Sequence, residues 1–77
     1  MMKMELMNME LESRIGEWLE KSGYRKDYVA KKLGVGMRQL NKYIRGESFP
    51  SVPRLFMLAE LFNCQTDDLY RKKTPTP

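Results

Sequence analysis

Apolar residues recur at helical spacing through the first third of the chain. At about 100° per residue, residues 4–21 place five of them on one stripe, with Leu19 at its edge: Met4, Met7, Leu11, Ile15 and Trp18. Gly23 follows, and Gly is a common residue at the end of a helix. The pattern therefore predicts a first helix over residues 4–21, with its start within residues 4–9.

Two shorter segments of helical spacing come next. The first spans residues 26–33 and stops before Gly34, and the second spans residues 37–45 and stops before Gly46. Each has one apolar face, made by Val29, Ala30, Leu33, Leu40, Tyr43 and Ile44. The turn between them is tight, and Gly34 can adopt a positive φ there without steric cost. Residues 26–45 are thus predicted to form a helix-turn-helix motif.

A fourth helix is predicted after Ser51, whose hydroxyl can accept a hydrogen bond from an early backbone N–H. Pro53 is tolerated in its first turn. Its broad apolar face comprises Val52, Leu55, Phe56, Leu58, Ala59 and Phe62. A short fifth helix is expected over residues 66–71, with Leu69 inward. No strand is predicted, so the expected fold class is all-α, a compact bundle of about five helices.

The length of 77 residues suits one domain. We expect a Met-rich N-terminal extension over residues 1–8, a helix-turn-helix domain over residues 9–71 and a disordered tail over residues 72–77. A domain this small buries only about 60% of its unfolded surface. Cys64 is the only cysteine and histidine is absent, so we expect no disulfide, no metal site and no cofactor.

Five of the seven methionines lie in residues 1–9. They form either an adaptable apolar surface for a partner or a disordered leader, and the pattern leaves both open. The chain contains no run of about 20 apolar residues. Glu5, Glu10 and Glu12 also interrupt any signal-peptide core. We expect a cytoplasmic protein that does not engage a membrane.

Basic residues concentrate in the predicted helix-turn-helix. The net charge is +4, but residues 25–46 contain seven basic residues and a single acid, Asp27. Such a concentration is typical of a protein with a polyanionic partner. A solvated, lysine-rich helical surface would give the same count, so charge alone leaves both interpretations open.

The motif and the segments after it contain several sequence blocks in a defined order: Val29-Ala30, Leu33-Gly34-Val35, Tyr43-Ile44-Arg45-Gly46, Pro50-Ser51, Leu58-Ala59 and Asp67-Asp68-Leu69. With these blocks, residues 11–70 resemble the lambda-repressor-like, Cro/Xre-type helix-turn-helix family of bacterial and phage regulators. The resemblance implies a bundle of about five helices that binds double-stranded operator DNA as a homodimer. It implies a sequence-specific transcriptional regulator, most simply a small phage or bacterial repressor.

In that family the second helix of the motif lies in the major groove with its N-terminal residues toward the base edges. Helical spacing agrees, because Leu40 inward leaves the polar side chains of residues 37–45 pointing out. We expect base contacts from Met37, Arg38, Gln39, Asn41 and Lys42, and backbone contacts from Arg25, Lys26 and Arg45.

Arg38 is the foremost candidate for a base contact. Its guanidinium can pair bidentately with guanine, which is worth ~1–3 kcal/mol of discrimination. Gln39 suits adenine, and Lys42 suits guanine or a phosphate. Met37 either packs against its own helix or touches a thymine methyl group.

Three positions depart from the family pattern. Arg25 and Gly36 stand where Ser or Thr often caps a motif helix, and Ile44 stands where an acidic residue is frequent. These departures leave a second function open, a protein-interaction module that acts as antagonist or co-factor of another regulator. Enzyme activity is not expected: without histidine, and with Cys64 predicted in the core, no nucleophile–base pair is visible.

Overall fold

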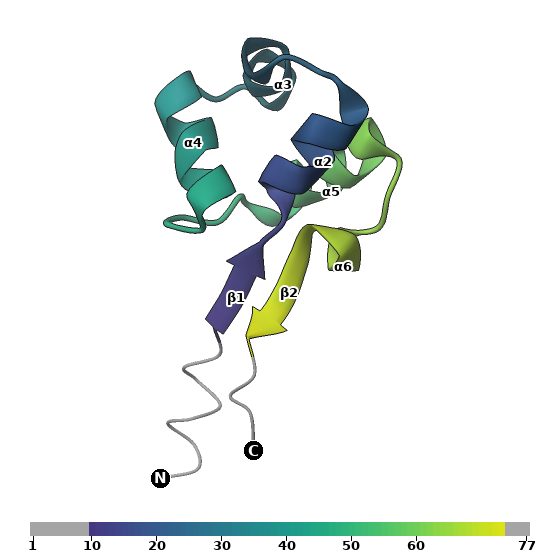
Figure 1. The fold of residues 1–77 in the computed structure, drawn as a ribbon. Helices are drawn as coiled ribbons and strands as arrows, with labels where there is room; N and C mark the ends of the chain where they lie inside the picture. The colour runs from purple at the N-terminus through teal and green to yellow at the C-terminus, as the bar shows by residue number, and fades with distance from the viewer. Residues whose placement is uncertain (1–9, 74–77) are drawn as a thin grey trace, which may run out of the picture.

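The computed structural model of the protein describes residues 10–73. Five helices pack together above a two-stranded antiparallel sheet (Figure 1). In chain order the elements are β1 (Glu10–Ser13), α2 (Ile15–Ser22), α3 (Lys26–Leu33), α4 (Met37–Arg45), α5 (Val52–Phe62), α6 (Thr66–Leu69) and β2 (Tyr70–Lys73).

The sheet corrects the expectation of an all-α fold, although the number of helices was right. It joins the two ends of the described chain, with Ser13 opposite Tyr70 and Leu11 opposite Lys72. The pairing continues past the strands, because the Arg14 N–H donates to the Leu69 carbonyl at 2.8 Å. The two strands are far apart in the sequence, so no local periodicity reports that they pair.

The predicted first helix is wrong in its N-terminal part. Leu11 lies in β1, and α2 begins only at Ile15. The chain changes direction at Ser13, whose hydroxyl oxygen accepts a hydrogen bond from the Ile15 N–H at 3.4 Å. The remainder of the predicted stripe, Met4 and Met7, lies outside the described residues, as does the predicted extension over residues 1–8.

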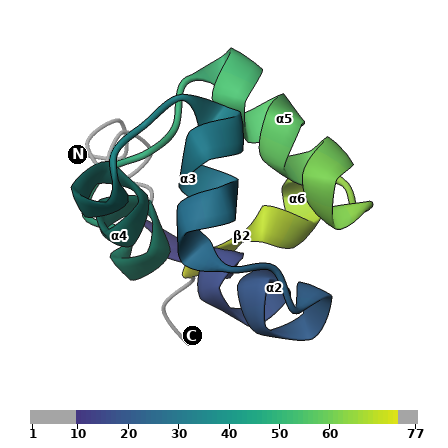
Figure 2. The same cartoon turned by 90° about the horizontal axis from the view of Figure 1, so that it is seen from above.

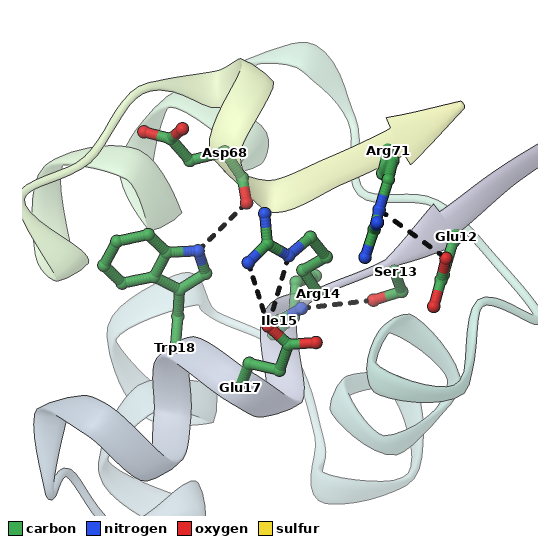
Figure 3. A network of polar contacts seen from close by, with 8 residues as sticks. All are labelled: Glu12, Ser13, Arg14, Ile15, Glu17, Trp18, Asp68 and Arg71. Carbon is green, nitrogen blue, oxygen red and sulfur yellow. Dashed lines mark hydrogen bonds and ion pairs between the residues drawn. The ribbon is translucent and has the colours of Figure 1, made fainter. Parts of the chain in front are cut away.

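The C-terminal prediction also needs correction. The short helix expected over residues 66–71 ends at Leu69, and the backbone then becomes the extended strand β2. Lys72 and Lys73, assigned to a disordered tail, are paired with β1. An ion pair between Arg71 and Glu12, 3.8 Å apart, spans the two strands (Figure 3).

The three middle helices have the extents that the spacing predicts. Gly34 and Gly46 follow α3 and α4 with φ of 76° and 78°, the left-handed conformation that favours glycine. Ser51 caps α5 by accepting a hydrogen bond from the Arg54 N–H at 3.4 Å. Since α5 has only 11 residues, no helix within the described residues is long and apolar enough to cross a membrane.

The core lies between the five helices and holds the side chains of Ile15, Leu19, Val29, Ala30, Leu33, Leu40, Tyr43, Leu58, Ala59, Phe62 and Leu69. Two residues predicted to face it do not: Val52 is 67% exposed and Phe56 is 59% exposed. They lie on an outer flank of α5, because Leu58 and Phe62 occupy the side of the helix that faces the core. Ile44 and Cys64 are half-buried at the edge of the core.

Trp18 packs at the edge of the core and also makes a polar contact. Its indole N–H donates to the Asp68 carbonyl at 2.9 Å, which ties α2 to α6 (Figure 3). A buried aromatic with a polar end gains from such a partner. The contact closes the lower end of the bundle next to the sheet.

Candidate nucleic-acid interface

The two motif helices are arranged so that α4 stands at one side of the molecule. In Figure 2, α3 lies between α4 and α5. The inner side of α4 is anchored by Leu40, which is fully buried, and by Tyr43, which is nearly so. Arg54 of α5 reaches across to donate to the Leu33 carbonyl at 3.1 Å, which fixes the end of α3. The inner side of α4 is thus anchored in the core, and its outer side is left to face outward.

The outer side of α4 carries three cations at positions one helical turn apart. Arg38 and Arg45 are exposed, and Lys42 between them is half-buried. Their spacing places all three opposite Leu40. We call the surface formed by Arg38, Lys42 and Arg45 the basic face.

One flank of the basic face is tied to α3. The ammonium group of Lys26, the first residue of α3, donates to the side-chain oxygen of Asn41 at 3.3 Å. A residue predicted to contact the DNA backbone and one predicted to contact a base are thereby brought together. The sequence separation of fifteen residues across a turn gave no local signal of this contact.

The other flank is tied to the loop after α4. The side-chain amide of Gln39 donates to the hydroxyl of Ser48 at 2.8 Å, and both residues are half-buried. Sequence reasoning missed Ser48 because the loop folds back along α4 only in the tertiary structure. Gln39 keeps its amide oxygen and a second N–H for other partners.

Both arginines predicted to contact the DNA backbone form ion pairs within the protein. Arg45 donates from two nitrogens to the carboxylate of Glu47 at 2.9 and 3.1 Å. Arg25 lies 3.2 Å from the carboxylate of Asp27. In both pairs the acid follows the arginine by two residues. The hydrogen bond from Arg45 holds the pKa of Glu47 below its usual value. Partial desolvation opposes this shift, and the positive charges of Arg45 and Lys42 add smaller lowering effects.

The N-termini of the motif helices are free of side-chain caps. Neither Arg25 before α3 nor Gly36 before α4 makes a side-chain capping bond. Met37 opens α4 and is 42% exposed, so it is available at the surface. The Tyr28 N–H is bonded to the Asp27 carboxylate at 3.0 Å, and no N-cap side chain bonds the other early N–H groups of either helix, which suits solvent or an anion there.

The sheet supports the far end of α4. The Ser13 hydroxyl donates to the Tyr43 carbonyl at 2.8 Å, in the last turn of α4. Gly46, which ends α4, lies close enough that a Cβ there would be 3.8 Å from the Cβ of Ser13. Among residues 10–73, no group of three or more His, Cys, Asp and Glu side chains is placed to hold a metal ion.

Comparison with known proteins gives one family match and several similar structures. A family model described as helix-turn-helix matches residues 15–69. The HTH-type transcriptional regulator ImmR of Bacillus subtilis (strain 168) is 36% identical over 64 residues, which cover 83% of this chain and 50% of ImmR. The chain thus spans about half the length of this curated relative.

Two solved structures have the same fold. A proposed DNA-binding protein of Bacteroides fragilis aligns with a TM-score of 0.73 at 23% identity, over 79% of this chain and 98% of that one. A transcriptional regulator of Listeria innocua aligns with a TM-score of 0.65 at 24% identity, over 86% and 67% of the two chains. At these identities the likeness establishes the shared fold.

Proposed function

Because this chain belongs to the helix-turn-helix family, we propose that it binds double-stranded DNA in a sequence-specific manner and regulates transcription. The observation that carries the proposal is the basic face, in which Arg38, Lys42 and Arg45 project from a helix whose opposite side is anchored in the core. A helix of this kind fits the major groove of B-DNA. The relative named as a transcriptional regulator supports the same function.

Base recognition is assigned to the first two turns of α4. Arg38 is exposed and forms no ion pair with another of the described residues, and we assign it the principal contact, to guanine. Lys42 follows one turn later, and Met37 offers an apolar contact to a thymine methyl group. Gln39 and Asn41 complete the proposed set with the polar atoms that their bonds to Ser48 and Lys26 leave free.

Contacts to the DNA backbone are assigned to Arg25, Lys26 and Arg45. Arg25 and Lys26 stand at the start of α3, where the positive end of the helix dipole, without an N-cap side-chain bond, adds to the attraction for phosphate. Such contacts orient a protein on the duplex but carry no sequence information. Repression would follow when the bound domain excludes polymerase from a promoter in the cytoplasm.

Fluorescence anisotropy with a labelled random-sequence duplex tests the proposal. The wild type is titrated from low to physiological salt beside Arg38→Ala/Lys42→Ala. We expect the double variant to bind at least about tenfold more weakly, with a log–log salt slope shallower by roughly 1 to 2 because fewer counterions are released. A control, Lys21→Ala/Lys32→Ala, removes the same charge from lysines that stack over Trp18 and Tyr28.

The control should bind nearly as well as the wild type. Equal weakening of both double variants would show that only overall charge matters and would remove the assignment to the basic face. A folded wild type that does not bind at low salt would end the DNA-binding proposal.

A homodimer is part of the proposal, with the second copy seated on the outer flank of α5. A single recognition helix reads few base pairs, and dimers place two such helices about 34 Å apart on the duplex. The flank of α5 exposes the apolar side chains of Val52, Phe56 and Met57, and exposed apolar patches often mark protein–protein interfaces. Sedimentation at increasing protein concentration measures the self-association.

The same apolar flank favours a second candidate function, the binding of another regulatory protein. Val52 and Phe56 are the most exposed large apolar residues among those described. In this alternative the domain acts as an antagonist or co-factor and does not require the basic face. A domain that stays monomeric, fails to bind the duplex and binds a second protein through Phe56 would establish it.

A further inference from the structure

Glu47 is the acidic side chain placed closest to the basic face in the contacts that the structure describes. Its carboxylate receives two hydrogen bonds from Arg45, at 2.9 and 3.1 Å, and neither side chain is buried. The charge of Lys42 also acts on Glu47 and contributes to lowering its pKa. One carboxylate is thus bonded directly to one of the three cations that we assign to DNA, and the charge of a second acts on it.

The position of Glu47 is set by the backbone. Its N–H donates to the Lys42 carbonyl at 2.9 Å, directly after the left-handed turn at Gly46. The loop therefore holds the backbone of Glu47 at the end of α4, which keeps its carboxylate within reach of Arg45. The two hydrogen bonds occupy two of the five N–H donors of the Arg45 guanidinium, and the carboxylate offsets the positive charge that a phosphate would meet.

We propose that Glu47 acts as an electrostatic brake on DNA binding, by holding Arg45 in an internal ion pair that competes with a DNA phosphate for its positive charge. The inference rests on the proposed function. Non-specific binding to DNA is supplied almost wholly by cation–phosphate contacts, so a carboxylate that occupies one such cation lowers the affinity for any duplex. Glu47 then limits how much of the protein is retained on DNA outside its operator.

Arg25 and Asp27 repeat this arrangement at the other end of the motif, with a 3.2 Å contact and the same spacing. Asp27 also accepts a hydrogen bond from the Tyr28 N–H at 3.0 Å in the first turn of α3. Its removal would therefore disturb the helix as well as the ion pair. Glu47 makes no such side-chain bond to a backbone N–H in the structure, and it is the residue to substitute.

The test compares Glu47→Gln with wild type on the random-sequence duplex, with Glu60→Gln as a control of equal charge. Glu60 is an exposed residue of α5, which α3 separates from α4 (Figure 2). We expect Glu47→Gln to bind about two- to fivefold more tightly, the range of a single exposed ion pair. Its salt slope should steepen by roughly 0.9, one additional phosphate contact. Glu60→Gln should match the wild type.

A second pair of variants shows whether the effect passes through Arg45. In an Arg45→Ala background, Glu47→Gln should improve binding by less than it does in the wild type, because the cation that the brake holds is gone. An effect of the same size in both backgrounds, or in Glu60→Gln, would overturn the proposal, as would unchanged affinity of Glu47→Gln.

The two proposals fail in distinguishable ways. If Arg38→Ala/Lys42→Ala weakens binding but Glu47→Gln leaves it unchanged, the proposed role of Glu47 is rejected and the DNA-binding function is retained. Absence of binding at low salt by both the folded wild type and Glu47→Gln removes both. Circular dichroism of each variant confirms that the helices are intact.

Discussion

The outward sides of α4 and α5 have opposite chemistry, although both helices bury their inward sides in one core. The outer side of α4 carries Arg38, Lys42 and Arg45, whereas the outer flank of α5 carries Val52 and Phe56. Charged side chains on a helix surface are well solvated and cost little free energy. Exposed apolar side chains gain the free energy of burial only when a partner covers them. This difference is the basis of our proposal that the two surfaces have different partners, DNA at α4 and protein at α5.

The two sides also differ in how they are restrained. Hydrogen bonds from Lys26 to Asn41 and from Gln39 to Ser48 hold the flanks of the basic face. Such pre-organisation reduces the conformational entropy that is lost on binding. Among the described residues, no side-chain hydrogen bond of this kind holds the apolar flank of α5. Substitution of Val52 or Phe56 should therefore leave the monomer folded.

The largest expected effect comes from removing the inner support of α4. Leu40 is fully buried, so Leu40→Ala should lower the free energy of unfolding by about 2–5 kcal/mol through lost burial and the remaining cavity. Phe56 is exposed, so Phe56→Ala should change the free energy of unfolding by less than about 1 kcal/mol. Urea denaturation followed by circular dichroism measures both. Equal losses would show that Phe56 belongs to the core.

Arg38→Lys tests whether the outer side of α4 reads sequence. The charge is kept but the bidentate fork is lost, so we expect a loss of ~1–3 kcal/mol of discrimination at one base pair. The measurement is anisotropy with an operator selected from random duplexes and with single-base variants of it. A uniform loss across all duplexes would assign Arg38 to the DNA backbone instead.

Phe56→Glu should weaken self-association by about tenfold or more, because burying an unpaired carboxylate in the interface is costly. Its stability and far-ultraviolet spectrum should stay near those of the wild type. Sedimentation equilibrium over a range of concentrations gives the dissociation constant. An unchanged constant would place the dimer interface elsewhere or remove the dimer.

The smallest expected effect concerns the contact between the sheet and α4. Ser13→Ala removes the hydrogen bond to the Tyr43 carbonyl, at 2.8 Å in the structure, and should destabilise the domain by about 0.5–1.5 kcal/mol. Amide hydrogen exchange should then quicken in the last turn of α4 more than in α5. Uniform acceleration in both helices would mean that Ser13 acts on global stability alone.

The sequence predicted the motif well because the information there is local. Gly34 and Gly46 stop their helices at positions where a positive φ is required, and Val29, Leu40 and Tyr43 recur at helical spacing. The three cations of the basic face follow from the same spacing, since the side opposite Leu40 must point outward. The roles of these cations in DNA binding remain predictions.

The ends of the domain could not be predicted in this way. Leu11 fits a helical stripe as well as it fits a strand, and only its pairing with β2 decides between them. Tyr70 continues the local pattern of α6, yet it lies extended because a partner strand is present. Strand pairing depends on residues distant in the sequence, so the pattern of a short sequence segment does not reveal its partner strand.

Local residue pattern alone was thus sufficient for five helices, the helix-turn-helix at residues 26–45 and the outward direction of Arg38. The tertiary structure alone decided the sheet, the exposure of Val52 and Phe56, and the partners of Gln39 and Asn41. The physical reason is the range of each interaction. Helical hydrogen bonds link residues four apart, whereas these contacts form only when separate segments fold against one another.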